Sequence, residues 1–142
     1  MKHLIAFILT AVSSFALATS KVEVQNPWVR LMPKDAPATG AFMTLKNTGD
    51  KDIKVLKAES SWAKNVELHD HVMENGIAKM RPVPSIDVKK SSETVLKPGS
   101  LHVMLIGLTK ELKEKDLVEI KLTLDNGDVL SVQAPVKPMM MK

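Results

Sequence analysis

The sequence consists of short segments in which apolar and polar residues alternate, and turn-forming residues interrupt them about every ten residues. Two interruptions contain Asn-Gly, at Asn75-Gly76 and within the run from Asp125 to Asp128. Asn-Gly between alternating segments is the strongest short-range signal of a β-hairpin. No segment has the 3.6-residue apolar period of a long amphipathic helix. We therefore expect an all-β fold.

The candidate strands are short and follow one another along most of the chain. From Val118 to Leu124 an apolar residue occupies every second position, as in a strand with one buried face. About seven to nine such strands indicate a Greek-key β-barrel or sandwich. One helical turn is expected at Lys110–Lys115. The candidate segments are Lys21–Gln25, Trp28–Met32, Ala41–Asn47, Ile53–Ala58, Val66–Met73, Ile77–Pro82, Ile86–Val88, Thr94–Leu96, Leu101–Leu108, Leu117–Leu124 and Val129–Val136.

The first eighteen residues have the pattern of a cleaved signal peptide. Lys2 precedes an apolar run from Leu4 to Val12, and Ala16-Leu17-Ala18 provides an A-x-A cleavage site. A short membrane anchor is the alternative, but the run is shorter than the roughly 20 residues of a spanning helix. A lipidated cysteine is excluded, because the sequence has none. We expect a signal peptide at 1–18, a periplasmic β-domain at 19–137 without stable membrane insertion, and a Met-rich tail at 138–142.

Composition excludes several classes of function. A chain of 142 residues suits one domain with one core, and without cysteine that core must form without disulfides. The net charge of +4 comes mostly from scattered lysines, with few aromatic residues, whereas nucleic-acid binding usually needs a basic patch with arginines or stacking groups. The sequence has neither a Gly-rich phosphate loop nor a G-x-S-x-G elbow. We therefore expect a binding protein rather than an enzyme.

Histidine and methionine are clustered. Outside the predicted signal peptide the histidines are His69, His71 and His102, and the nearby methionines are Met73, Met80 and Met104. A two-residue turn at Asn75-Gly76 would pair His71 with Met80 and would place His69, His71, Met73 and Met80 on one face. A three-residue turn would move Met80 to the other face. The sequence leaves the turn type open.

Imidazole and thioether together form a soft, mostly neutral ligand set that suits Cu(I). Zinc usually takes cysteine, histidine or carboxylate, and calcium and magnesium require oxygen ligands. A blue-copper electron-transfer site needs a cysteine thiolate, which this chain lacks. Each residue also has an ordinary explanation, because a lone strand histidine is commonly a surface residue and methionine commonly fills core gaps. The joint clustering is what favours a site for Cu(I) held for transfer.

The spacing of these residues resembles a known family. His69, Met80, His102 and Met104 fit H-x10-M-x21-H-x-M, the copper-binding motif of the periplasmic copper chaperones called PCuAC. The resemblance extends over segments such as "NPWVR", "GAFMTLKNTGD", "VELHDHVMENGIAKMRPV" and "LKPGSLHVMLIGL". It implies a cupredoxin-like β-barrel that binds one Cu(I) through these four residues. It further implies delivery toward assembly of the cytochrome oxidase CuA centre, with an oxidase subunit or another assembly chaperone as acceptor.

Some donors lie outside the motif. His71 and Met73 are candidate auxiliary groups, and His71 is either an outer group or an added donor for Cu(II). Met139, Met140 and Met141 form a tail that either binds more copper or is simply disordered. We expect a monomer. The alternatives left open are copper sequestration for tolerance, a β-sandwich binding module without metal, and a metalloenzyme.

Overall fold

Strands run through most of residues 21–139, which are the residues that the computed structural model describes. No helix occurs among these residues. The strands are β1 Val22–Arg30, β2 Ala38–Asn47, β3 Ile53–Glu59, β4 Ala63–Glu74, β5 Ile77–Pro82, β6 Ile86–Val88, β7 Ser92–Leu96, β8 His102–Leu108, β9 Leu117–Leu124 and β10 Val129–Lys137. The all-β prediction is confirmed.

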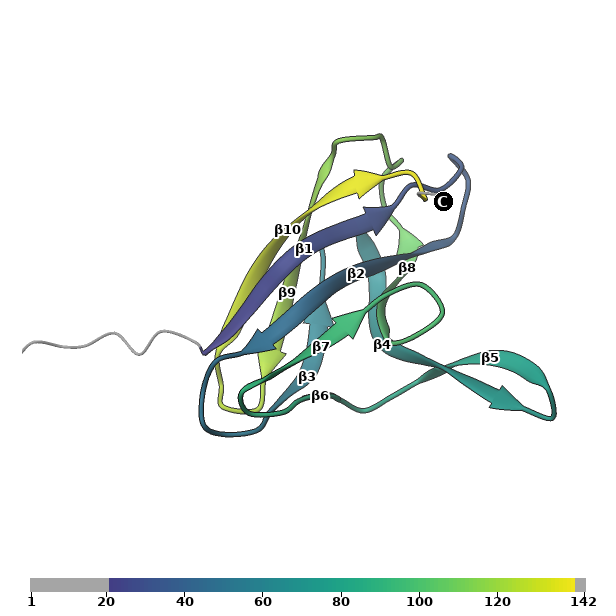
Figure 1. The fold of residues 1–142 in the computed structure, drawn as a ribbon. Helices are drawn as coiled ribbons and strands as arrows, with labels where there is room; N and C mark the ends of the chain where they lie inside the picture. Colours follow the sequence, from purple (N-terminus) through teal and green to yellow (C-terminus); the bar gives the residue numbers. More distant parts are fainter. Residues whose placement is uncertain (1–20, 140–142) are drawn as a thin grey trace, which may run out of the picture.

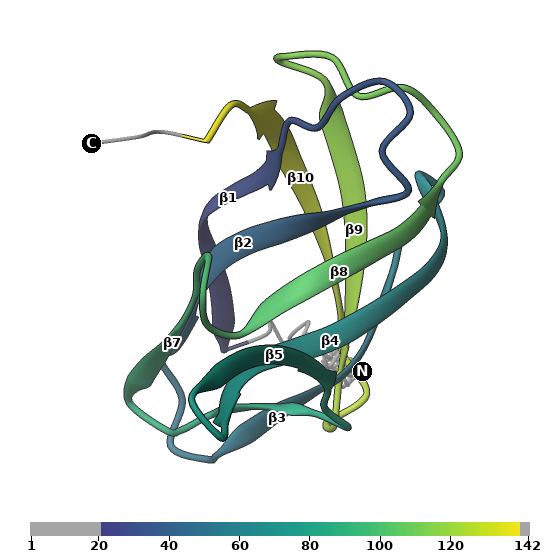
Figure 2. The ribbon, with the colours of Figure 1, turned by 90° about the vertical axis from the view of Figure 1, so that its right-hand side faces the viewer.

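The strands form two layers that are joined along one edge (Figures 1 and 2). The path of hydrogen-bonded neighbours is β5-β4-β8-β2-β1-β10-β9-β3-β6, and β7 pairs with β2. We call β5, β4, β8, β2, β1 and β7 the front sheet, and β10, β9, β3 and β6 the back sheet. The parallel pairing of β1 with β10 connects the two sheets, while the other pairings described are antiparallel.

The hydrophobic core lies between the two sheets. On β9 the residues at every second position from Val118 to Leu124 are buried, as the alternation of the sequence predicts. Leu45 on β2 and Leu105 on β8 are 0% exposed and belong to the same core cluster. The inner face of the front sheet therefore anchors its strands, which leaves the outer face of β4 and β8 available for a site.

The strand pattern differs from the expectation in detail. There are ten strands among residues 21–139 rather than seven to nine. The sequence predicts Lys21–Gln25 and Trp28–Met32 as separate segments, but most of both lies in the single strand β1, with a shift in its pairing to β2 between Gln25 and Trp28. Asn26 has a φ of 51° there, so the chain bends without ending the strand.

The helical turn expected at Lys110–Lys115 is wrong. Its place is taken by a non-helical turn, in which the Lys113 amide donates to Asp116 Oδ2 and the Asp116 amide donates to the Lys113 carbonyl. An Asp side chain that satisfies a nearby backbone amide competes with helix formation in this way. The second Asn-Gly hairpin is confirmed, since β9 and β10 pair around residues 125–128.

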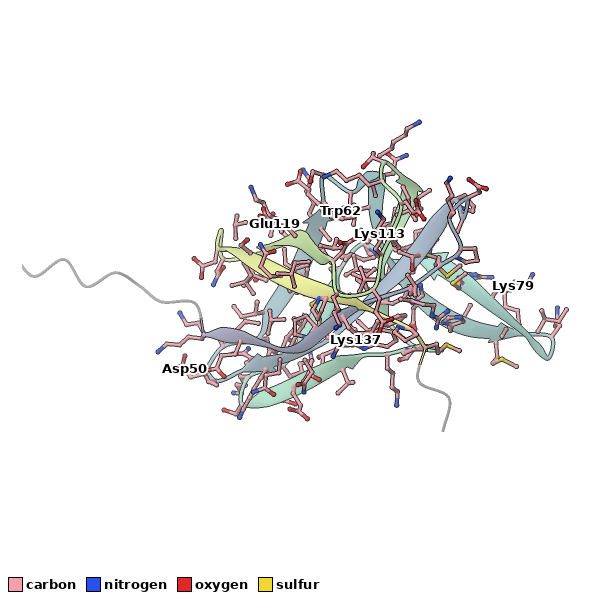
Figure 3. The ribbon with its side chains drawn as sticks, turned by 90° about the horizontal axis from the view of Figure 1, so that it is seen from above. Asp50, Trp62, Lys79, Lys113, Glu119 and Lys137 are labelled. Atoms are coloured by element: carbon pink, nitrogen blue, oxygen red, sulfur yellow. The ribbon has the colours of Figure 1, made fainter. Side chains whose placement is uncertain are left out.

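The hairpin of β4 and β5 extends from the body of the molecule (Figure 1). All six residues of β5 are exposed, and β5 ends the strand path with β4 as its neighbour. In Figure 3, Lys79 marks this hairpin at the opposite end of the molecule from Asp50. Within residues 21–139 no helix is long and apolar enough to cross a membrane. The expected signal peptide, and Met140 and Met141, lie outside the described residues.

Candidate metal centre

A cavity of about 400 Å³ opens on the outer face of the front sheet, beside the base of the hairpin. Its wall also includes Pro98 and Gly99 from the turn before β8. Imidazoles and thioethers predominate among its polar and sulfur-bearing side chains, which are those of Arg30, Met32, Thr39, His71, Met80, His102 and Met104. Among residues 21–139 no group of three or more His, Asp or Glu side chains is placed to hold a metal ion. The donors gathered at this cavity are thus of mixed nitrogen and sulfur type.

The pairing of β4 with β8 joins the two halves of the sequence motif. His69 lies directly opposite His102, and Glu67 lies directly opposite Met104. The centroids of the two imidazole rings are 5.6 Å apart. Two histidines separated by 33 positions in the chain (102 − 69) thereby become cross-strand neighbours.

The hairpin has the two-residue turn that the ligand face requires. Glu74 pairs with Ile77 and His71 pairs with Met80, so Met80 is on the same face as His71. Asn75 and Gly76 have φ values of 51° and 77°, which fits the type I′ turn favoured by Asn-Gly. The Val83 amide donates to the Leu68 carbonyl at 2.8 Å and closes the base of the hairpin. The register that the sequence left open is therefore the one that brings Met80 to the cavity.

His102 is a buried imidazole with one nitrogen in use. It is 3% exposed, and its Nδ1 lies 2.8 Å from the Ser100 carbonyl oxygen. Burial lowers the pKa of His102, and the nearby His69, His71 and Arg30 lower it further against the opposing effect of the Ser100 hydrogen bond. The ring is therefore neutral at pH 7, with Nδ1–H donating to Ser100 and Nε2 carrying a lone pair.

His69 is also buried, at 9% exposure, and is tied in a different way. Its Nε2 lies 2.6 Å from Oε2 of Glu67, two residues earlier on the same face of β4. Its Nδ1 is buried and has no hydrogen-bond partner. The cavity wall includes His71 rather than His69. Thus His69 is a cross-strand neighbour of His102 but does not line the cavity itself.

His71, outside the four-residue motif, lies on the cavity wall. Its ring centroid is 5.4 Å from that of His102, which is about as close as His69 comes. Its Nδ1 is 3.4 Å from the Ser100 carbonyl, a longer contact than that of His102. His71 is therefore a third imidazole, close to His102 and on the same cavity wall as Met80 and Met104.

The methionines differ in position. Met104 is half-buried on β8, and Met80 on β5 is 49% exposed, and both line the cavity. Met73 shares the face of His71 but is 70% exposed and lies outside the cavity wall. Met139 lines a neighbouring hollow with Trp28 and Pro98, and Pro98 also belongs to the cavity wall.

Phe42 supports the cavity from β2. Its ring lies 6.1 Å from the His102 ring and 4.7 Å from that of Trp28, with Arg30 stacked over it at 5.5 Å. A Cβ at Gly40 would come within 2.7 Å of Cζ of Phe42. Gly40 thus allows the Phe42 ring to lie back over its own strand, beside the strand position paired with Met104.

Comparison with known proteins identifies the family. Residues 22–136 match the model of a family described as "LpqE-like: Putative lipoprotein LpqE-like". The chain belongs to this LpqE-like family. A relative from Leifsonia xyli subsp. xyli, named "Putative lipoprotein Lxx21020", is 33% identical over 117 residues, which cover 82% of this chain and 69% of that protein.

Solved structures connect the LpqE-like chain to PCuAC domains. DR1885 from Deinococcus radiodurans is 30% identical, and its apo solution structure has a TM-score of 0.67 over 99% of this chain and 94% of that one. The "CuI-DR1885" structure has a TM-score of 0.62 over 91% and 85% of the two chains. The copper-bound PCuAC domain from PmoF2 has the same fold, with a TM-score of 0.72 at 19% identity over 86% and 97%. The PCuAC resemblance and its cupredoxin-like β-fold are confirmed.

Sequence reasoning missed two groups of this LpqE-like chain. Met32 follows β1 and reaches the cavity from far along the chain, which no local spacing indicates. Glu67 bonds to His69, and the i, i+2 spacing on a strand was the available signal, because it puts both side chains on one face.

Proposed function

We propose that this protein is a copper chaperone that binds one Cu(I) through His69, Met80, His102 and Met104. The observation that carries the proposal is the cross-strand register of β4 and β8, which sets His69 opposite His102 and Glu67 opposite Met104. The two-residue turn of the hairpin adds Met80 to the same face. Met80, His102 and Met104 line the cavity, and His69 is the cross-strand neighbour of His102.

The donor set favours Cu(I) over other metals. Thioether sulfur and neutral imidazole suit a soft monovalent ion, whereas zinc rarely takes thioether and calcium or magnesium require oxygen. A neutral His102 needs to release no proton when a metal binds at Nε2, which lowers the cost of binding at neutral pH. His71 is an added donor for the same ion, and a Cu(II) state would make most use of it because Cu(II) prefers additional nitrogen ligands.

The same geometry suits transfer rather than catalysis. Met80 is 49% exposed at the cavity mouth, so an incoming ligand from another protein can displace it before the buried His102 is reached. Copper would then pass by stepwise ligand exchange, with each new bond replacing an old one. The acceptor we propose is the CuA subunit of cytochrome oxidase or another assembly chaperone, in the periplasm. The copper-bound PmoF2 domain and CuI-DR1885 support a copper-binding role.

Competition between the apo protein and a Cu(I) chelator tests the site. Met80→Ala, His102→Ala and Met104→Ala are each expected to weaken Cu(I) binding, whereas Met73→Ala serves as a matched control because Met73 lies outside the cavity wall. Unchanged affinity in all three variants would contradict the site assignment.

A transfer assay tests delivery. The Cu(I)-loaded protein is mixed with the metal-free soluble CuA domain of an oxidase, and the visible absorption of the acceptor is followed after oxidation. If copper reaches the acceptor faster from the loaded protein than from a Cu(I)–chelator complex, the result supports delivery. Copper that stays on this protein while the acceptor remains empty would support sequestration instead.

A further inference from the structure

His69 and His102, the two histidines of the motif, form their hydrogen bonds through different ring nitrogens. His102 contacts the Ser100 carbonyl through Nδ1, and His69 contacts the Glu67 carboxylate through Nε2. A carbonyl oxygen and an ionised carboxylate can only accept hydrogen bonds. An imidazole that offers a lone pair to a metal has one N–H, and in that form these hydrogen bonds put the proton on Nδ1 of His102 and on Nε2 of His69. The lone pairs left for a metal are Nε2 of His102 and Nδ1 of His69.

The free nitrogen of His69 has an unmet requirement. Its Nδ1 is buried with no hydrogen-bond partner, and a buried polar atom left without a partner costs about 1–3 kcal/mol. A metal ion that accepts this lone pair would satisfy it. The neighbouring ring of His102, with centroids 5.6 Å apart, supplies a second nitrogen close by.

We propose that Glu67 is a positioning residue that makes His69 bind copper through Nδ1, while His102 binds through Nε2. This inference rests on the proposed copper function. The carboxylate fixes the tautomer and the orientation of the ring and makes the imidazole a stronger donor, as outer-shell carboxylates do for other metal-binding histidines. The strand position of Glu67 also lies directly opposite that of Met104, so this carboxylate is on the same face of the sheet as the proposed donors.

Nitrogen-15 NMR of the imidazoles tests this directly in the apo protein, at about pH 8, above the ordinary histidine pKa of about 6.5. His69 is expected as the Nε2–H tautomer and His102 as the Nδ1–H tautomer. Glu67→Ala is expected to release His69 into a mixture of tautomers, whereas Glu67→Gln keeps Nε2–H because its amide oxygen still accepts. The Glu67 side chain is 44% exposed, so these variants should fold.

Copper loading gives the second half of the test. With Cu(I) bound, the resonances of His69 Nδ1 and His102 Nε2 should shift, and Glu67→Ala should lower Cu(I) affinity about 10–100-fold. Glu74→Ala is the control, because Glu74 is on the same strand but outside the histidine pair. It should leave the two resonance shifts and the Cu(I) affinity unchanged. Coordination through the same nitrogen of both rings, or Nδ1–H at His69 in the apo protein, would overturn the inference. Absence of any copper binding would instead overturn the proposed function, while the apo spectra would still report on Glu67.

A separate observation concerns Met32, which lines the cavity from the segment after β1. It is half-buried, and it shares the cavity wall with Met80 and Met104. We infer that Met32 is a reserve copper donor, which binds Cu(I) when Met80 is displaced. A third thioether on the same cavity would keep the ion coordinated while a ligand from an acceptor enters.

A double-mutant cycle with leucine tests the reserve role, because leucine removes the sulfur and keeps most of the apolar volume. In the wild-type background, Met32→Leu is expected to change Cu(I) affinity about twofold or less. In a Met80→Leu background, the same substitution should weaken Cu(I) affinity by a factor about ten times larger. Met43→Leu in the core is the matched control, expected to be additive with Met80→Leu. Additive effects of Met32→Leu would overturn the inference.

Discussion

The two sides of the proposed copper site are built differently. His69, His102 and Met104 lie on β4 and β8 within the front sheet, and we call them the floor. The segment 70–82 forms the outer part of the hairpin, which we call the arm, and it contains His71, Met73 and Met80. Both floor histidines are buried and hydrogen-bonded, whereas every residue of β5 in the arm is exposed.

This difference suggests that the floor holds the copper ion and that the arm controls its release. The floor is part of a sheet whose other face forms the core, so its geometry is maintained by the stability of the whole domain. The arm past His69 is paired only within its own hairpin, since the pairing of β4 with β8 ends at His69–His102. Segments with few buried contacts open locally at lower free energy than the core. We therefore assign Cu(I) affinity mainly to the floor and ligand exchange mainly to the arm.

The largest expected effect is the loss of a floor imidazole. His102→Ala should lower Cu(I) affinity by at least about 100-fold, because even outer partners of metal-binding histidines contribute roughly 10–100-fold. His71→Ala in the arm should cost less, as it removes an added donor. Chelator competition on both variants measures the two losses of Cu(I) affinity. A larger loss for His71→Ala would reverse the roles of floor and arm.

An intermediate effect is expected from strain in the hairpin turn. Gly76 has a φ of 77°, and a Val there would cost about 1–2 kcal/mol in the left-handed region. Gly76→Val should reduce hydrogen-exchange protection of β5 amides and weaken Cu(I) binding several-fold, with little change in global unfolding by urea.

Gly127→Val is the matched control for that variant. Gly127 also has a positive φ, of 89°, and nothing lies within 4 Å of a Cβ at either glycine. Its hairpin joins β9 and β10, whose alternate side chains are in the core. Gly127→Val should therefore lower global stability and leave Cu(I) affinity unchanged. Equal effects of both substitutions on copper would show that the arm has no separate role.

The smallest effect is expected at the far part of the arm. Met73 is 70% exposed and outside the cavity wall, so Met73→Ala should change Cu(I) affinity by less than about twofold, or about 0.4 kcal/mol. Chelator competition again provides the measurement. A loss comparable to that of Met80→Ala would extend the site along the arm.

The arm could be predicted from the sequence further than the floor. Asn75-Gly76 indicated a hairpin, and once a two-residue turn was assumed, the pairing of His71 with Met80 followed by counting. The face of Met80 still depended on turn type, which the φ values of Asn75 and Gly76 decide. Local chain geometry was enough because both partners lie within one hairpin.

The floor depends on contacts between distant segments, and no local pattern determines those. That His69 faces His102 required the β4–β8 register, which is set by packing of Leu68, Val103 and Leu105 in the core. The family spacing selected these residues without giving their geometry. The position of Met32 at the cavity depends on tertiary packing in the same way. The bond from His69 to Glu67 and the turn at 113–116 are instead local, so the i, i+2 and i, i+3 spacings of these residues could have predicted them.

X-ray absorption spectroscopy of the protein loaded with one equivalent of Cu(I) tests the central claim most directly. We expect a copper ion with both sulfur and nitrogen neighbours, about two of each, and loss of one sulfur in Met80→Ala when Met32 is also replaced by leucine. A copper shell of nitrogen and oxygen alone, with no sulfur contribution, would contradict the account.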